Sequence, residues 1–233
     1  MTKEDKLVSI IMSAYNSENT ITNSIESLLN QTYKNIEILI VDDCSIDKTY
    51  EICNDYAKKN ENIKLFKNEE NIGLTKSLNL LINKANGDYI ARQDSDDISF
   101  NSRIEKQLEY IKVYDLDACS SRALIKNTDK LIPNLSYFLP NKFLIRFKNP
   151  FIHGTLLIRK SVLNKIGNYD EKFYFAQDYK LMSELIIRKF KVKIIKEPLY
   201  VLNMDNNISS NFSKEQKYYA DCVRKNLEPI NHI

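Results

Sequence analysis

A regular alternation of apolar runs and helical patterns between residues 7 and 92 constrains the fold of this chain more than any other feature. Four short runs rich in β-branched residues are each typical of a buried strand: 7–12, 36–41, 63–66 and 88–92. Between them, apolar side chains recur with helical spacing within 21–29, 52–57 and 74–85. Such an alternation predicts an α/β fold with a mostly parallel sheet flanked by helices.

The alternation weakens after residue 100. Apolar periodicity there predicts helices over 102–114, 178–189 and 214–227, and strands over 117–125, 154–159 and 191–196. No linker, repeat or low-complexity segment divides the 233 residues. We therefore expect one domain over 1–233, in which the second half completes the sheet of the first.

Composition excludes several classes of protein. The net charge of +3 gives no basic field that would favour nucleic acid as a partner. No apolar run approaches the length of a membrane span, and the N-terminal residues lack the pattern of a signal peptide, so we expect a cytoplasmic protein. The four cysteines form no C-x-x-C and are expected to be buried free thiols.

Carboxylates gather where predicted strands end. Asp94, Asp96 and Asp97 follow the strand at 88–92, and Asp42 and Asp43 follow the strand at 36–41. Because the carboxyl ends of parallel strands meet at one edge of a sheet, these groups should face a common ligand there. Hard oxygen donors suit Mg²⁺ or Mn²⁺, which fill their coordination with substrate phosphates and water. A solvated acidic turn is the alternative explanation of the aspartates alone.

The sequence excludes a glycine-rich phosphate cradle, because neither G-x-G-x-x-G nor G-x-x-x-x-G-K-[ST] occurs and the chain has only four glycines. If phosphates bind, a metal ion and side chains must hold them. A carboxylate can accept a hydrogen bond from the ring N–H of a pyrimidine base, so the pair of Asp42 and Asp43 is suited to nucleotide recognition.

Three blocks in this order and spacing resemble the inverting family 2 glycosyltransferases, which have the GT-A fold. They are "VSIIMSAYNSENTITNSIESLLNQTYKNIEILIVDDCSIDKT", "NIGLTKSLNLLINKANGDYIARQDSDD" and "HGTLLIRKSVLNKIGNYDEKFYFAQDYKLMSEL". The resemblance covers roughly residues 7 to 200. It implies a nucleotide-sugar-binding half over about 1–100, and an acceptor-binding half with a C-terminal helix over about 101–233.

The resemblance also implies roles for particular residues. Asp178 matches the catalytic base, and Asp94 and Asp96 match the DxD pair that binds the donor through Mn²⁺ or Mg²⁺, with Asp96 as the likelier direct ligand. The positions matched to nucleotide-sugar binding are Ser13, Ala14, Tyr15, Asn16, Asp43, Lys76, Asp94 and Ser95. The positions matched to the acceptor side are His153, Gly154 and Gln177.

The implied reaction is transfer of one hexosyl or N-acetylhexosaminyl group, with inversion, from a UDP-sugar to a glycan or lipid-linked glycan in surface polysaccharide biosynthesis. No Q-x-x-R-W follows, which argues against a processive polymer synthase. Two departures from the family pattern stand out: Gln177 replaces the usual Glu before the base, and Gln93 replaces the usual apolar residue before the DxD.

Two other functions stay open at this point. A catalytically weak nucleotide-binding module of the same fold is one, favoured by Gln177. A haloacid-dehalogenase-like phosphatase is the other, although its D-x-D motif normally follows the first strand rather than the fourth. The sequence leaves the oligomeric state open. The stretches 141–151 and 186–196 mix basic and apolar residues, which is typical either of peripheral contact with the inner membrane face or of buried strands with solvated lysines.

Overall fold

The computed structural model describes residues 6–204 and 212–230 of the chain. Its first half contains the predicted parallel sheet, in the order β3-β2-β1-β4. The strands are β1 (Val8–Ala14), β2 (Ile36–Asp42), β3 (Ile63–Lys67) and β4 (Tyr89–Arg92). The connecting helices are α1 (Ile21–Leu29), α2 (Thr49–Lys59) and α3 (Leu74–Lys84).

The second half extends the same sheet and makes it mixed. Beyond β4 the order continues β8-β6-β9-β5, and β7 pairs with β6 off this path. The strand β8 is antiparallel to both of its neighbours, whereas β6 and β9 are parallel to each other. These strands are β5 (Ile98–Ser99), β6 (Ala118–Ile125), β7 (Leu131–Ile132), β8 (Leu157–Arg159) and β9 (Val192–Leu202).

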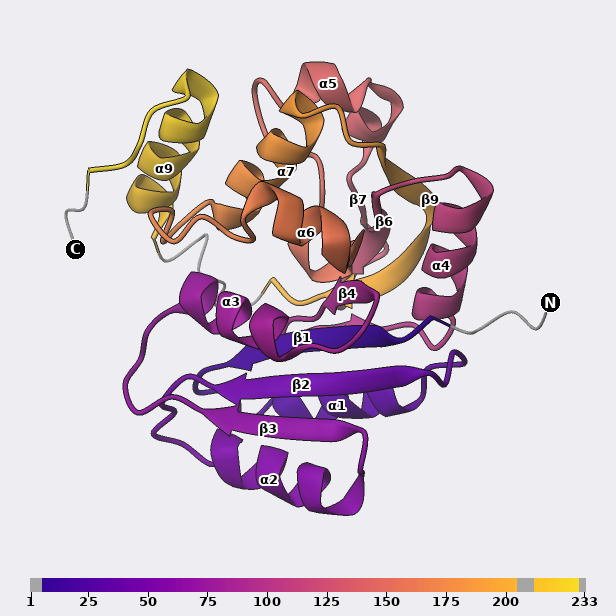
Figure 1. Ribbon diagram of the computed structural model, residues 1–233, viewed down its shortest axis with the longest axis vertical. Helices are drawn as coiled ribbons and strands as arrows, with labels where there is room; N and C mark the ends of the chain where they lie inside the picture. Colours follow the sequence, from indigo (N-terminus) through magenta and orange to yellow (C-terminus); the bar gives the residue numbers. More distant parts are fainter. Residues whose placement is uncertain (1–5, 205–211, 231–233) are drawn as a thin grey trace.

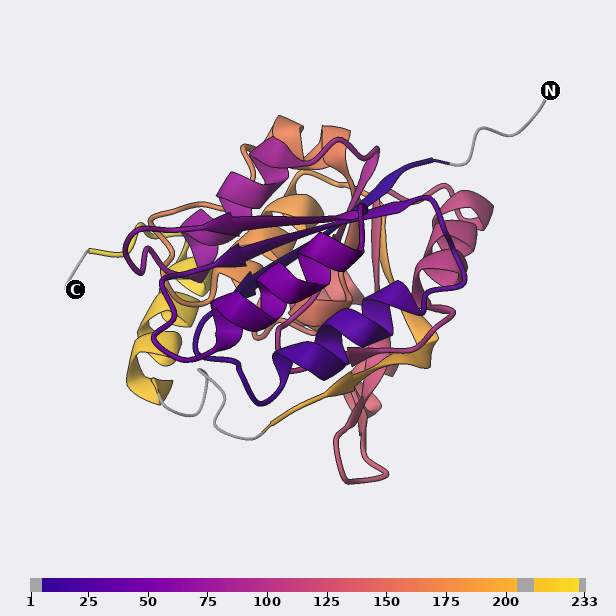
Figure 2. The same ribbon diagram turned by 90° about the horizontal axis from the view of Figure 1, so that it is seen from below.

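Helices cover both faces of the sheet (Figure 1), which is why its central strands are apolar on both sides. Ile10 and Met12 of β1 belong to the cluster built with α1, α2 and α4 (Arg103–Val113). Figure 2 shows α1 and α2 side by side on this face. Ile11 points to the opposite face, as the two-residue period of a strand requires. That face is covered by α3, α6 (Lys160–Ile166) and α7 (Gln177–Ile187), and α9 (Ser213–Lys225) packs on the outside against α7.

The predicted elements are found with shifted ends, and several short ones were not predicted. The expected strand at 154–159 is wrong at its start, because a 3₁₀ turn, η2 (His153–Thr155), precedes β8. The strand expected at 191–196 continues to Leu202; Pro198 lies at a register shift opposite Arg122, where a missing N–H is tolerated. The elements that were not predicted are β5, β7, η1 (Leu135–Phe138), α5 (Asn141–Leu144) and α6.

All four cysteines are free, and Cys53, Cys119 and Cys222 are buried as expected, whereas Cys44 is half-buried. Burial raises the pKa of the Cys53 thiol to about 12, so it behaves as an inert core group. None of the helices within residues 6–204 and 212–230 is long and apolar enough to cross a membrane.

Candidate active site

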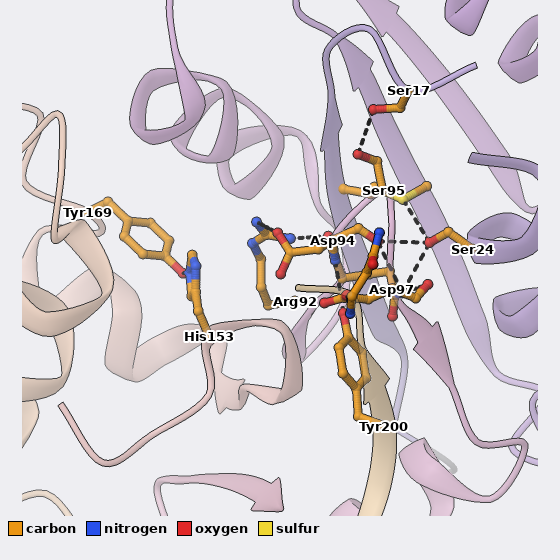
Figure 3. Close-up of polar contacts among 12 residues, drawn as sticks. Ser17, Ser24, Arg92, Asp94, Ser95, Asp97, His153, Tyr169 and Tyr200 are labelled. Carbon is orange, nitrogen blue, oxygen red and sulfur yellow. Dashed lines mark hydrogen bonds and ion pairs between the residues drawn. The ribbon is translucent and has the colours of Figure 1, made fainter. Parts of the chain in front are cut away.

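The loops that follow β1, β2 and β4 meet at one edge of the sheet, as predicted. Asp43 N donates to Ala14 O at 2.8 Å, and Asn16 N donates to Ser45 Oγ at 3.0 Å. The hydroxyl groups of Ser17 and Ser95 are 2.9 Å apart and join the first loop to the acidic turn (Figure 3). Three segments that are distant in sequence therefore form a single polar surface.

The Asp94 carboxylate is held by a buried arginine. Arg92, the last residue of β4, is 1% exposed, and its Nη2 lies 2.5 Å from Asp94 Oδ1 (Figure 3). A second guanidinium nitrogen donates to the carbonyl of Gln93. Although burial opposes the charge on Arg92, the nearby Asp94 carboxylate raises the pKa of this guanidinium. The ion pair therefore joins a buried guanidinium to a carboxylate that is still partly open to solvent, and it fixes the position of that carboxylate.

Gly154 is packed against the other side of Asp94. A Cβ built on Gly154 would lie 2.5 Å from the Tyr200 hydroxyl and 2.8 Å from Asp94 Oδ2, closer than real side chains allow. The Tyr200 hydroxyl in turn accepts a hydrogen bond from Asp94 N at 3.1 Å. The second half of the chain thus sets the position of the acidic turn. Only glycine at position 154 leaves room for the Asp94 carboxylate and the Tyr200 hydroxyl.

The three carboxylates of the turn have separate environments. Asp97 is 1% exposed and accepts from Asn203 N at 2.6 Å; burial, followed by the charges of Asp94 and Asp96, raises its pKa to about 8. Asp94 and Asp96 are partly exposed. Burial and the charge of Asp94 raise the pKa of Asp96 to about 6. Asp97 therefore supports the turn, and Asp94 and Asp96 are the two of its carboxylates that reach solvent.

The unusual Gln93 is explained by a buried polar network beneath the turn. Its Oε1 accepts from Ser99 Oγ at 2.7 Å and from Arg103 Nη1 at 2.9 Å, and its Nε2 donates to Ser24 Oγ at 3.0 Å. Arg103 Nη2 also donates to the carbonyl of Arg92 at 2.6 Å. An apolar residue at position 93 would remove one hydrogen-bond partner from each of these buried groups, which is costly.

The carboxylate of Asp43 supports a loop. It is 3% exposed, and its Oδ1 accepts from Asn68 Nδ2 at 2.7 Å and from Ile72 N at 3.0 Å. Its Oδ2 accepts from Gly73 N at 2.9 Å. Because a carboxylate offers about four acceptor positions, roughly one is left for a ligand.

Asp178 lies in the first turn of α7, where the partial positive charge of the helix favours a carboxylate. It is half-buried, and its Oδ2 accepts from Asn149 Nδ2 at 2.7 Å. Burial raises its pKa above the usual value, which makes it more basic. Gln177, the neighbour expected on the acceptor side, is 8% exposed.

His153 is a neutral member of the site. Its Nε2 lies 2.7 Å from the Tyr169 hydroxyl (Figure 3), and burial followed by the charge of Arg92 lowers its pKa to about 3. It therefore acts as a hydrogen-bonding group rather than a cation. The remaining nucleotide-side residues are spread more widely: Ala14 is buried, Tyr15 is 48% exposed, and Lys76 is exposed on α3 with no hydrogen bond or ion pair to any described residue.

Sequence reasoning missed four residues that shape the site: Arg92, Asn149, Tyr169 and Tyr200. Arg92 had a signal, because a charged residue ends an otherwise apolar strand and must be neutralised when buried. Asn149, Tyr169 and Tyr200 contact the site through hydrogen bonds to residues distant in sequence. Such contacts leave no periodic pattern in the sequence.

The donor set suits a divalent cation with substrate ligands. Among residues 6–204 and 212–230, no group of three or more His, Cys, Asp or Glu side chains is placed to hold a metal ion. Asp94 and Asp96 are nevertheless a close acidic pair whose repulsion a cation would relieve, and Mg²⁺ commonly uses one or two carboxylates together with phosphate oxygens.

The fold and the polar loops at the carboxyl edge of its sheet are those of a known enzyme family. Residues 9–167 match the model for Glycosyl transferase family 2, and the chain belongs to that family. It is 33% identical over 209 residues to the putative glycosyltransferase EpsE of Bacillus subtilis, covering 86% of this chain and 74% of EpsE. It is 33% identical over 190 residues to the O-antigen biosynthesis glycosyltransferase WbnJ of Escherichia coli, covering 77% of this chain and 72% of WbnJ.

Solved structures confirm the GT-A fold. S. aureus TarS 1–349 in complex with UDP has a TM-score of 0.75 and 21% identity, over 96% of this chain and 67% of that one. The mannosyltransferase PcManGT from Pyrobaculum calidifontis, in complex with GDP-Man and Mn²⁺, also has a TM-score of 0.75, with 17% identity over 95% of this chain and 65% of that one. The protein is therefore a family 2 glycosyltransferase, which rules out the phosphatase alternative.

Proposed function

We propose that the protein transfers a single sugar, with inversion, from a UDP-sugar to a hydroxyl group of a glycan or lipid-linked glycan, in surface polysaccharide biosynthesis. One observation carries the proposal: the acidic pair of Asp94 and Asp96 lies at the edge where the strand-end loops meet, with Asp94 held by Arg92, and the pKa of Asp178 is raised. The charge of Asp94 contributes to the raised pKa of Asp178, which supports their proximity.

The acidic pair would hold the donor diphosphate through Mn²⁺ or Mg²⁺. When bound, that ion offsets the charge that develops on the leaving diphosphate. Arg92 fixes one oxygen of Asp94, which leaves Oδ2 and the Asp96 carboxylate to face the ligand. The Ser17–Ser95 contact holds the β1 loop against the turn, so the donor would meet a surface formed in advance.

The chemical step needs a base on the acceptor side. Asp178 would take the proton from the acceptor hydroxyl, and Asn149 orients its carboxylate by donating to Oδ2. Attack from the face opposite the diphosphate would invert the anomeric carbon. A neutral His153, held by Tyr169, would offer a hydrogen bond without repelling the metal ion.

The choice of UDP rests on Asp43 and on a relative. The unused acceptor position of Asp43 suits a pyrimidine N–H, and TarS was solved with UDP. GDP is the competing nucleotide, because PcManGT was solved with GDP-Man. The polysaccharide context is supported by the similarity to WbnJ, which is named for O-antigen biosynthesis.

Donor binding can be tested by thermal shift with UDP, GDP or dTDP, each with and without Mn²⁺ or Mg²⁺. We expect the largest stabilisation from UDP with metal, because a ligand that binds only the folded state raises its stability. Asp96→Asn should lose the metal-dependent part. Asp88→Asn is the matched control, because Asp88 directly precedes the opposite end of β4 and is about half exposed.

Two results would oppose this proposal. Equal affinity of wild type and Asp96→Asn for UDP with Mn²⁺ would remove the acidic pair from donor binding. Donor binding without any hydrolysis or transfer of UDP-sugars would favour the second candidate, a nucleotide-binding module with weak catalysis, for which the neutral Gln177 is the specific observation.

A further inference from the structure

The segment 141–148 exposes two phenylalanine side chains beside α5, at the end of the molecule opposite α2 (Figure 1). Phe143 and Phe147 are 53% and 57% exposed, and their ring centroids lie 5.1 Å apart. Leu144 and Ile145, from the same turns, are buried. Since Leu144 and Ile145 already anchor the segment in the core, the exposed ring pair has no evident role in folding.

The sequence on either side of these rings carries positive charge. From residue 130 to residue 169 the chain has no Asp or Glu and seven Lys or Arg residues: Lys130, Lys142, Arg146, Lys148, Arg159, Lys160 and Lys165. Lys142, Arg146 and Lys148 are exposed and flank the rings. An exposed aromatic pair within a basic, acid-free stretch is typical of a surface that meets negative charge and apolar material together.

The segment is held firmly and leads into the candidate active site. The Tyr179 hydroxyl of α7 donates to Ile145 O at 2.6 Å, and Arg224 of α9 donates to Phe147 O at 3.2 Å. The next residue after the segment, Asn149, binds the candidate base Asp178. Anything docked on this surface would therefore lie close to the acceptor side.

The other mixed stretch, 186–196, differs because it exposes no aromatic side chain. Ile187, at the end of α7, is 65% exposed beside Arg188 and Lys189, but Phe190 is half-buried. Residues 192–196 are the buried strand with solvated lysines that the pattern equally predicted: Val192, Ile194 and Ile195 are buried in β9, and Lys193 and Lys196 are exposed. The exposed rings of 141–148 thus distinguish the two stretches.

We propose that Phe143 and Phe147, together with Lys142, Arg146 and Lys148, form a docking surface for a lipid bilayer that carries anionic headgroups. Side chains more than half exposed protrude rather than line a groove, and a fluid bilayer can close around protruding rings. The basic side chains would meet the headgroups while the rings enter the interface. A rigid protein partner would instead need a matching cavity for each ring.

Docking on this surface identifies the class of acceptor, a deduction that rests on the proposed function. A bilayer seated against 141–148 would present the head of a lipid-linked glycan next to Asn149 and Asp178. The enzyme would then receive its acceptor by diffusion within the membrane plane, while the donor arrives from solution at the strand-end loops.

Co-sedimentation with vesicles tests the docking surface. Wild type should bind vesicles of phosphatidylcholine mixed with phosphatidylglycerol and fail to bind phosphatidylcholine alone. Lys142→Gln/Arg146→Gln/Lys148→Gln should weaken binding by about fivefold for each charge removed. Phe143→Ser/Phe147→Ser should weaken it at least as much, and Lys58→Gln/Lys59→Gln on α2 is the control expected to bind as wild type.

The outcomes separate this inference from the proposed function. The membrane-docking proposal would be refuted if wild type did not bind anionic vesicles, or if the α2 control lost as much binding as the triple variant. It would also be refuted if wild type were a dimer that Phe143→Ser/Phe147→Ser converted to a monomer. UDP-dependent thermal shifts of the same variants report on folding and on the donor site. Normal UDP shifts with no vesicle binding would refute docking alone, whereas vesicle binding without any nucleotide shift would refute the proposed function alone.

Discussion

Glu37 permits a quantitative test of how the parallel half of the sheet is held together. It is 6% exposed on β2, at the end of the sheet away from the acidic turn. Its Oε1 accepts from Ser9 Oγ and from Asn86 N, both at 2.6 Å, and its Oε2 accepts from Lys64 Nζ at 2.8 Å. Burial acts to raise the pKa of Glu37, but the hydrogen bonds from Lys64, Ser9 and Asn86 outweigh it and lower the pKa from 4.5 to about 2.

The lowered pKa fixes the sign and size of the effect. Because the folded state holds the proton less tightly than the unfolded chain, ionised Glu37 stabilises the fold above pH 4.5, and this stabilisation is lost as the pH falls toward about 2. At about 1.4 kcal/mol per pKa unit the shift corresponds to about 3 kcal/mol at pH 7. Solvent screening of the half-exposed Lys64 reduces the expected value to about 2–3 kcal/mol.

Glu37→Gln keeps the shape of the side chain and removes its charge. Urea unfolding should give a free energy of unfolding about 2–3 kcal/mol below wild type at pH 7, and about 1 kcal/mol below it at pH 3. Glu70→Gln, at an exposed position, is the control and should match wild type at both pH values. A loss that is the same at pH 7 and pH 3 would refute the electrostatic account of this contact.

Three further predictions concern the candidate site. Gly154→Ala should push the Asp94 carboxylate out of place and weaken UDP binding in the presence of Mn²⁺ but not in its absence, as measured by calorimetry; equal losses under both conditions would contradict this. Asp178→Asn can still accept from Asn149, so the melting temperature should stay near wild type while turnover falls by about 10² to 10⁴; wild-type turnover would place the base elsewhere. Asp43→Ala should weaken UDP binding by about 1–3 kcal/mol in a titration, and tighter binding of GDP than UDP by wild type would count against the pyrimidine assignment.

The parallel half of the fold was predictable because each strand is buried on both faces. Such strands are continuous apolar runs, as in Ile36–Asp42, and the polar residues that follow them mark the functional edge. The position of Asp94 and Asp96 at this edge was predicted in this way. Short elements such as β5 and β7, with two residues each, have no period to detect.

The supports of the site were harder to predict because they depend on pairings between distant residues. Nothing in the local sequence of Tyr200 indicates that its hydroxyl accepts from Asp94 N, 106 residues earlier. Gln93 looked like a departure from the family pattern, and the structure shows that it accepts hydrogen bonds from Arg103 and Ser99 in a buried network. Asp97 looked like a third ligand, and its burial makes it a support for the turn.

The contacts from β9 to the acidic turn have a consequence for the timing of folding during synthesis. Tyr200 accepts from Asp94 N, and Asn203 N donates to Asp97, each across 106 residues. At about 5–20 residues per second, a ribosome needs about 5–20 s to make that intervening length. During that interval the strands of the first half would already have been synthesised, but the acidic turn would still lack its contacts with Tyr200 and Asn203. The acidic turn would therefore reach its final shape only after residues 200–203 have been translated.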